Sequence, residues 1–163
     1  MNPRIAVAGD RPQPLGSAID TIAQSGEPTC LLWLIDLSAE TSARRVRAEL
    51  KSRYADMLAH AASLTALRHL IILCLHDESI AERKVHAAGA AFATRLHAEL
   101  ERARGRYVDV AVIDISACRD TRRLLDRVEE AADQPAGPAG SVALTWREIR
   151  DRTIHAAAAA AEY

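Results

Sequence analysis

One helix and the strand that follows it, at residues 82–115, constrain the fold of this chain most strongly. The helical stretch spaces apolar side chains three and four residues apart, as one buried helix face requires; they are Val85, Ala88, Phe92, Leu96 and Leu100. Four alanines and Gly89 occupy positions 87–91, so half of this face is nearly flat. The strand that follows, VDVAVIDI, is apolar enough to be buried on both sides, as strands of parallel sheets are.

The same alternation of strand and helix runs through the whole chain. We expect strands at 4–8, 30–37, 68–75, 107–115 and 142–146. Helices are expected at 15–24, from Ser38 or Thr41 to about 67, at 82–105, at 119–132 and at 147–161. Ser79 and Glu82 fit an S-x-x-E capping box at the start of the third helix. Strands that alternate with helices predict a Rossmann-like α/β sandwich of three layers around a parallel five-stranded sheet.

The order of the strands follows from the need to cover both faces of that sheet. If the strands lay in chain order with right-handed crossovers, every helix would fall on one face. The other face would then stay wet, at about 25 cal/mol per Å² of apolar area. We therefore predict the order 2-1-3-4-5, with a ligand crevice at the carboxyl ends of the first and third strands.

Bulk properties exclude several classes of protein. The 163 residues predict a single domain over 1–163, with a flexible loop at about 133–141. A net charge of −1 gives no case for a nucleic-acid or anionic-membrane partner. The three cysteines form no C-x-x-C pair, so neither a zinc site nor a redox pair is expected. No apolar run reaches the length of a secretion signal or a membrane span, so we expect a cytoplasmic protein.

The first loop is a candidate cofactor site. Gly9 and Gly16 flank it, but prolines lie between them, and proline offers no N–H to a phosphate. Arg11 could offset the negative charge of the neighbouring Asp10, and Asp36 ends the next strand, where an acid can hold a ribose hydroxyl. A degenerate nucleotide loop and a plain strand-to-helix turn both remain open, with NADP or NAD as the cofactor of the first interpretation.

Two further features have both a functional and a structural interpretation. His76, beside Asp77, follows the third strand and could serve as a general base, although Asp77 fits an ordinary turn equally well. The helix up to about residue 67 carries a run of basic residues in which Glu49 and Arg53 form an i, i+4 pair. The basic run fits a solvated face best, and the alternative is a surface for an acidic partner such as an acyl carrier protein.

With these residues described, the chain resembles the short-chain dehydrogenase/reductase family, especially its ketoacyl-reductase-like members. Residues 4–36 look like the family's first strand, glycine turn, helix and next strand, and residues 68–116 look like its central strand, active-site helix and following strand. Whether 30–36 matches the family's second or fourth strand stays open. The family is about 250 residues long, so one or two strand–helix units would be missing.

The departures from the family pattern decide what the resemblance implies. The catalytic tyrosine and lysine would fall on Val85 and Gly89, or on His86 and Ala90 in the next register, and neither pair supplies a phenol and an ammonium. No serine lies at the family's catalytic spacing. The resemblance therefore implies a pseudoenzyme with no catalytic and no metal-binding residues.

What the resemblance retains is a scaffold for pairing. We expect a non-catalytic subunit that forms a homodimer, or a heterodimer with an active ketoacyl reductase, in fatty-acid or polyketide biosynthesis. The expected interface lies on the two long helices, at Tyr54, Met57, Val85, Ala88, Gly89, Phe92 and Leu96. The alternative is a small NAD(P)-binding reductase or other nucleotide-binding protein that uses Gly9, Arg11, Gly16 and Asp36. A receiver-like or flavodoxin-like signalling module is a third interpretation, although the first strand ends in a single acid.

Overall fold

The computed structural model describes residues 4–13, 15–137 and 140–162, and its centre is a parallel sheet of five strands. The strands are β1 (Ile5–Gly9), β2 (Cys30–Leu37), β3 (His69–His76), β4 (Asp109–Asp114) and β5 (Ser141–Thr145). The helices are α1 (Gly16–Ile19), α2 (Ala43–Ser63), α3 (Glu82–Arg104), α4 (Thr121–Asp133), α5 (Trp146–Ile149) and α6 (Ile154–Ala161). The Rossmann-like, three-layer α/β fold predicted from the sequence is confirmed.

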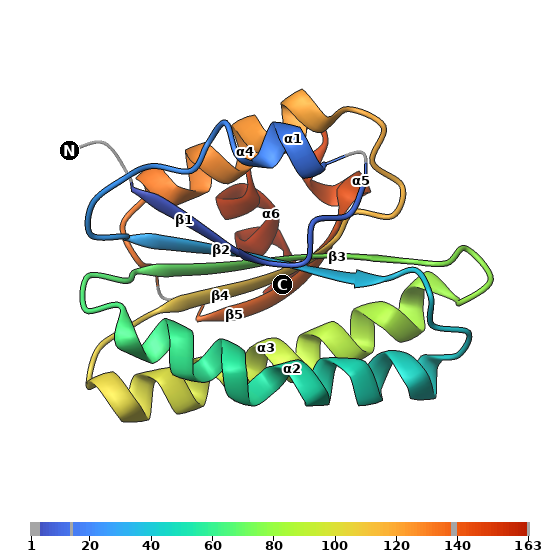
Figure 1. The fold of residues 1–163 in the computed structure, drawn as a ribbon, viewed down its shortest axis with the longest axis horizontal. Coiled ribbons are helices and arrows are strands. Elements are labelled where there is room, and N and C mark those ends of the chain that lie inside the picture. The colour runs from blue at the N-terminus through green and yellow to red at the C-terminus, as the bar shows by residue number, and fades with distance from the viewer. Residues whose placement is uncertain (1–3, 14, 138–139, 163) are drawn as a thin grey trace.

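The predicted strand order is wrong. The strands lie in chain order, β1-β2-β3-β4-β5, instead of 2-1-3-4-5. Both faces are nevertheless covered, because α1, α4, α5 and α6 pack on one face, and α2 and α3 pack on the other (Figure 1). In a sheet that grows in one direction, connections over opposite faces have opposite hands. Two of the four connections must therefore be left-handed, against a strong general preference. Burial of both faces outweighed that preference.

Successive residues of the central strands point to opposite faces, and both faces are buried. On β2, Leu32 and Leu34 face the layer of α1 and α4, while Leu31 and Ile35 face the layer of α2 and α3. The strand is therefore apolar throughout its length rather than alternating, as expected for the interior of a parallel sheet.

The flat part of α3 lies on the sheet. A methyl group added at Gly89 would lie 3.0 Å from Val112 Cγ1 and 3.9 Å from Ala143 Cβ. The small residue therefore lets the α3 backbone approach β4 and β5. The close approach that the alanine-rich stretch predicted is made inside the chain itself.

The two long helices are joined at their ends by Arg104. Its guanidinium donates to the carbonyl oxygens of Ala61, Leu64 and Thr65, at the end of α2. The Ala61 and Leu64 carbonyls also accept the backbone N–H groups of Leu64 and Leu67, and a cation at this end of a helix is favourable. No helix of the described residues is both long and apolar enough to cross a membrane.

Several predicted element boundaries need correction. The capping box at Ser79 and Glu82 is absent: Ala81 precedes α3 without a side-chain cap, and the Ser79 N–H donates to Asp77 Oδ1 at 2.8 Å. Ser42, rather than Ser38 or Thr41, caps α2. The last predicted helix is divided into α5 and α6. Within the loop predicted at 133–141, residues 138 and 139 lie outside the described residues.

The packing of α3 leads to a prediction about stability. Gly89→Val should lower the free energy of unfolding by about 1–3 kcal/mol, because the added atoms would overlap Val112 and Ala143. Ala91→Val is the matched control, since Ala91 is exposed on the same helix, and it should cost less than about 1 kcal/mol through helix propensity alone. Urea unfolding of both variants measures the difference, and equal losses would contradict the close packing.

Candidate functional site

The carboxyl edge of the sheet has two places where neighbouring connections diverge. β1 leads to α1 on one face and β2 to α2 on the other; β3 and β4 lead to α3 and α4 in the same divergent way (Figure 1). Ligands of open α/β sheets usually bind where adjacent connections separate like this. The single crevice predicted between the first and third strands is therefore replaced by one beside β1 and β2 and another beside β3 and β4.

An ion pair occupies the crevice beside β1 and β2. Arg53, from α2, donates to both carboxylate oxygens of Asp10, at 3.1 and 3.0 Å. Asp10 Oδ2 also accepts the backbone N–H of Asp36, at 2.9 Å. Arg53 makes a second ion pair with Glu49, at 2.9 Å, as their i, i+4 spacing predicted. One arginine is therefore shared between two carboxylates at this crevice.

The residues predicted to bind a cofactor lie at this crevice, but they serve the chain's own turns. Gly9 has a φ of +87°, and a side chain there would collide with Leu34 O and the Trp33 ring. Arg11 donates to the carbonyl oxygens of Gly9 and Asp10, both at 3.3 Å. Asp36 Oδ1 accepts from the backbone N–H and the hydroxyl of Ser38. Gly16 begins α1, which has only four residues. Pro14 lies outside the described residues. Cofactor binding at these positions stays a prediction.

The crevice beside β3 and β4 contains a buried His–Asp pair. His76 Nε2 lies 2.8 Å from Asp114 Oδ2, and the two side chains are only 5% and 4% exposed. The Ser116 hydroxyl donates to Asp114 Oδ1 at 2.6 Å, and the same hydroxyl accepts the backbone N–H of His76 at 2.9 Å. His76 Nδ1 lies 2.8 Å from the carbonyl oxygen of Asp77.

This geometry favours the imidazolium form of His76. Both ring nitrogens face acceptors, so both must donate. The hydrogen bond to Asp114 raises the pKa of His76, against the effect of burial. Burial works to raise the pKa of Asp114, but hydrogen bonds from His76 and Ser116 outweigh it and lower that pKa. An imidazolium with both protons in use has no lone pair for a substrate, so the predicted general base acts here as half of an ion pair.

A small pocket of about 130 Å³ lies next to this pair. It is lined by His76, Ser116, Arg119, Thr121 and the half-buried Cys118, among others. Burial raises the pKa of the Cys118 thiol, so the thiol is protonated at neutral pH rather than a reactive thiolate. Among the residues that the structure describes, no three His, Cys, Asp or Glu side chains converge as metal ligands would.

The positions at which the resemblance would require a tyrosine and a lysine lie on α3. Val85 and Gly89 are buried against the sheet. In the alternative register, His86 Nε2 lies 2.9 Å from the carbonyl oxygen of Ala143, so this histidine is bound to β5. Neither register places an acid–base group at the carboxyl edge.

The residues predicted for an interface fall into two groups. Met57, Val85, Gly89 and Leu96 are buried in the chain's own core. Tyr54, Ala88 and Phe92 line a groove between α2 and α3, together with Leu50, Ala91, Arg47, Lys51 and Arg95. Of the residues predicted for an interface, only Tyr54, Ala88 and Phe92 therefore line a surface groove.

Sequence reasoning missed the partners that decide the chemistry of both crevices. It paired His76 with the adjacent Asp77, whereas the acid is Asp114, which ends the neighbouring strand. It also left Arg53 paired with Glu49 alone. The available signal was that Asp10 and Asp114 each follow or end an apolar strand, where parallel strands bring such side chains to one edge.

The His76–Asp114 pair predicts a pH-dependent contribution to stability. The raised pKa of His76 makes its contribution complete below its ordinary value of 6.5 and lost as the pH rises through the folded pKa. The lowered pKa of Asp114 makes its contribution complete above 3.8 and lost as the pH falls through the folded pKa. Asp114→Asn should therefore lose about 3 kcal/mol near pH 5.5, and less as the pH rises above neutrality. Urea unfolding at several pH values measures this, and a loss that is constant up to pH 9 would contradict the ion pair.

No family model, curated protein or solved structure matches this chain.

Proposed function

We propose that this protein is a non-catalytic subunit related to the short-chain reductases, which pairs through α2 and α3 with a catalytically complete reductase. The observation that carries the proposal is the strand order. Dinucleotide-binding folds have the order 3-2-1-4-5-6, in which the first strand lies beside the fourth, and the fifth and sixth follow. The order β1-β2-β3-β4 matches this arrangement if β2, β3 and β4 are the fourth, fifth and sixth strands.

This correspondence also accounts for the faces on which the helices lie. In right-handed crossovers from the fourth to the sixth strand, both helices lie on one face, as α2 and α3 do. The helix after the first strand belongs on the other face, as α1 does. The second and third strands of the complete fold would be missing, which agrees with the length deficit of one or two units. Under this proposal, β2 corresponds to the fourth strand and not to the second.

The absence of catalysis is supported by the state of the charged groups. Asp10 is paired with Arg53, and His76 with Asp114, so the polar groups of both crevices are used internally. Val85 and Gly89 stand where a tyrosine and a lysine would be required. Because Asp10 and His76 already have internal partners, they are not free to bind a nucleotide, which supports pairing over the alternative of NAD or NADP binding.

The α2–α3 groove supports a partner other than a second copy. Its volume is about 210 Å³, and its floor is apolar. Its charged lining residues are Arg47, Lys51 and Arg95, and none of its described lining residues is acidic. Arg95 lies over the Tyr54 ring, 4.2 Å from its centre. Two copies joined at this face would oppose like charges, so the partner's matching surface is acidic. An acyl carrier protein and a role in fatty-acid or polyketide biosynthesis follow from the resemblance alone.

The non-catalytic proposal leads to a prediction about cofactor binding. Calorimetric titration with NADPH and with NADH to about 1 mM should give no binding heat, because the charged groups Asp10 and His76 are held in internal ion pairs. Micromolar binding of either cofactor would overturn the non-catalytic proposal in favour of the nucleotide-binding alternative.

The proposal also leads to a prediction about pairing with a reductase. The purified chain should be a monomer by light scattering, and the tagged chain expressed in its own host should bind a reductase with a complete Ser, Tyr and Lys set. That reductase, purified and mixed with the chain, should form a one-to-one complex. Arg47→Glu should weaken the complex by about tenfold or more, because it reverses a charge at the groove.

Arg122→Glu is the matched control, since Arg122 is exposed on α4, on the other side of the sheet. It should leave the complex unchanged. A stable homodimer, a captured protein without the reductase residues, or equal effects of the two charge reversals would each contradict the proposal. Phe92→Asp is a poor probe of this interface, because Phe92 is only 8% exposed and its loss would disturb the core.

A further inference from the structure

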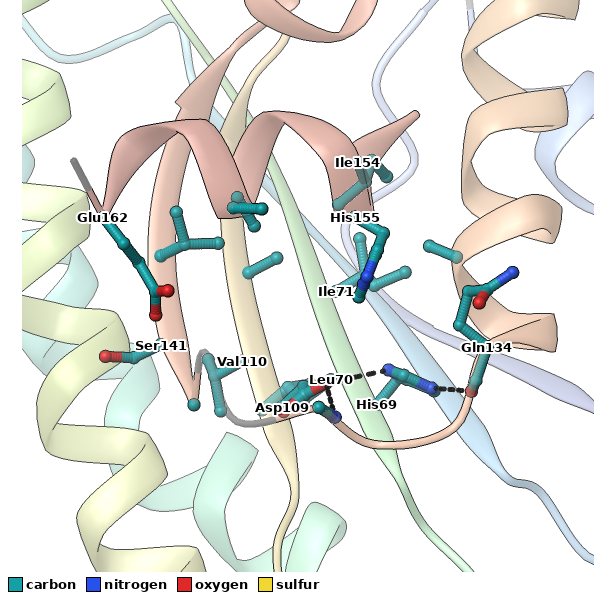
Figure 2. A pocket seen from close by; sticks show the side chains of 17 residues that line it. His69, Leu70, Ile71, Asp109, Val110, Gln134, Ser141, Ile154, His155 and Glu162 are labelled. Carbon is teal, nitrogen blue, oxygen red and sulfur yellow. Dashed lines mark hydrogen bonds and ion pairs between the residues drawn. The ribbon is translucent and has the colours of Figure 1, made fainter. Parts of the chain in front are cut away.

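The larger pocket associated with the sheet lies at the amino edge, away from both crevices. The first residues of β3, β4 and β5 border it, together with the last turn of α4 and with α6 (Figure 2). Its volume is about 210 Å³. Apolar protein cavities of about 150 Å³ bind benzene, so this pocket can hold a ring or a short hydrocarbon chain. Its walls are largely apolar and include Leu70, Ile71, Val110, Ala111, Val142, Ile154, Ala158 and Ala159.

One end of this pocket carries hydrogen-bond acceptors. Asp109 Oδ2 accepts the Gly137 N–H at 2.7 Å and lies 3.8 Å from His69 Nδ1 (Figure 2). His69 Nε2 lies 2.6 Å from the carbonyl oxygen of Gln134. Because a carbonyl can only accept, Nε2 carries the proton, and the neutral ring turns the Nδ1 lone pair towards Asp109.

Two acceptors at this end of the pocket, Asp109 Oδ1 and His69 Nδ1, lack a donor among the described residues. Asp109 Oδ1 is buried and has no hydrogen-bond partner among the residues that the structure describes. Burial lowers the pKa of His69, so its ring is neutral near pH 7 and Nδ1 is a second acceptor. Burial raises the pKa of Asp109 and outweighs the hydrogen bond from Gly137, which acts in the opposite direction. A buried carboxylate whose charge is not compensated is costly, and a cation that reaches the exposed part of the Asp109 side chain, which is 24% exposed, would lower that cost.

The field in the pocket also favours a cation. α4 ends at Asp133, and the residue after it, Gln134, lines the pocket and meets His69, so the partial negative charge of this helix end lies beside the acceptors. Glu162 lines the far end (Figure 2). The titratable groups near enough to act on Asp109 are His69, His97 and His155, from β3, α3 and α6.

We propose that the amino-edge pocket binds a small primary amine with a hydrocarbon body about the size of a benzene ring. The ammonium group donates to Asp109 Oδ2 and to His69 Nδ1, which lie 3.8 Å apart. The hydrocarbon body lies against the apolar walls and the alanines of α6. This site is independent of the pairing proposed for α2 and α3, because it lies on the other side of the sheet.

The test uses three probes of one shape: 2-phenylethylamine, 2-phenylethanol and phenylacetate. Calorimetric titration at pH 7.5 should detect the amine, bind the alcohol more weakly and detect no binding of the carboxylate. Asp109→Asn should weaken the amine by about tenfold to a hundredfold, as expected for a lost hydrogen bond between charged groups, and leave the alcohol unchanged. Ala158→Leu, which fills the pocket, should weaken both the amine and the alcohol.

Glu162→Gln is the matched control, because it removes the same charge from the other end of the pocket. It should change amine binding far less than Asp109→Asn does. Equal binding of amine and alcohol, an amine affinity unaffected by Asp109→Asn, or a larger effect of Glu162→Gln would overturn the proposal. Thermal unfolding of each variant establishes that the fold is intact.

Discussion

Both faces of this parallel sheet are apolar, and the rest of the structure depends on covering both with a single short chain. Strands in chain order would normally draw every helix to one face. Here α1 and α4 cover one face while α2 and α3 cover the other, so the hand of the connections changes twice along the sheet. Each change separates two neighbouring connections. The requirement for burial therefore also creates the two crevices at the carboxyl edge, and the position of the possible sites follows from the packing of the core.

Acidic side chains are compensated differently at the two edges of the sheet. At the carboxyl edge, where α/β proteins usually bind ligands, Asp10 meets Arg53 and His76 meets Asp114. Asp10 and Asp114 each have a cation of the same chain, so these two carboxylates are already compensated without a substrate. At the amino edge, Asp109 has only a backbone N–H and a histidine that favours its neutral form. An unmet need for donors is a stronger sign of a ligand than a set of satisfied ion pairs, because only the former gains free energy when a molecule binds.

The sequence predicted the fold class and the five strands, because continuous apolar runs of strand length are a strong signal. The strand order could not be predicted, since it depended on a choice between covering both faces and keeping every crossover right-handed. The faces of α3 were also ambiguous: the spacing of Val85, Gly89 and Leu96 is the same whether they contact the sheet or another chain, and the structure assigns them to the chain's own core. His76 was recognised, but its partner was not, because Asp114 lies 38 residues away and meets it only through strand pairing. Asp109 gave no signal, since its isolation depends on the burial of a single oxygen atom.

The simple strand order has a consequence for how the chain can assemble. Each strand after β1 pairs with the strand that precedes it in the sequence, and no strand is inserted between two earlier ones. The sheet can therefore grow from its first edge as the chain leaves the ribosome, with every new strand meeting a partner that is already in place. A sheet of order 2-1-3-4-5 would have to extend at both edges. Growth at one edge also leaves the first and last strands as the two borders of the sheet, and each is only five residues long, which limits the backbone available for pairing with other molecules.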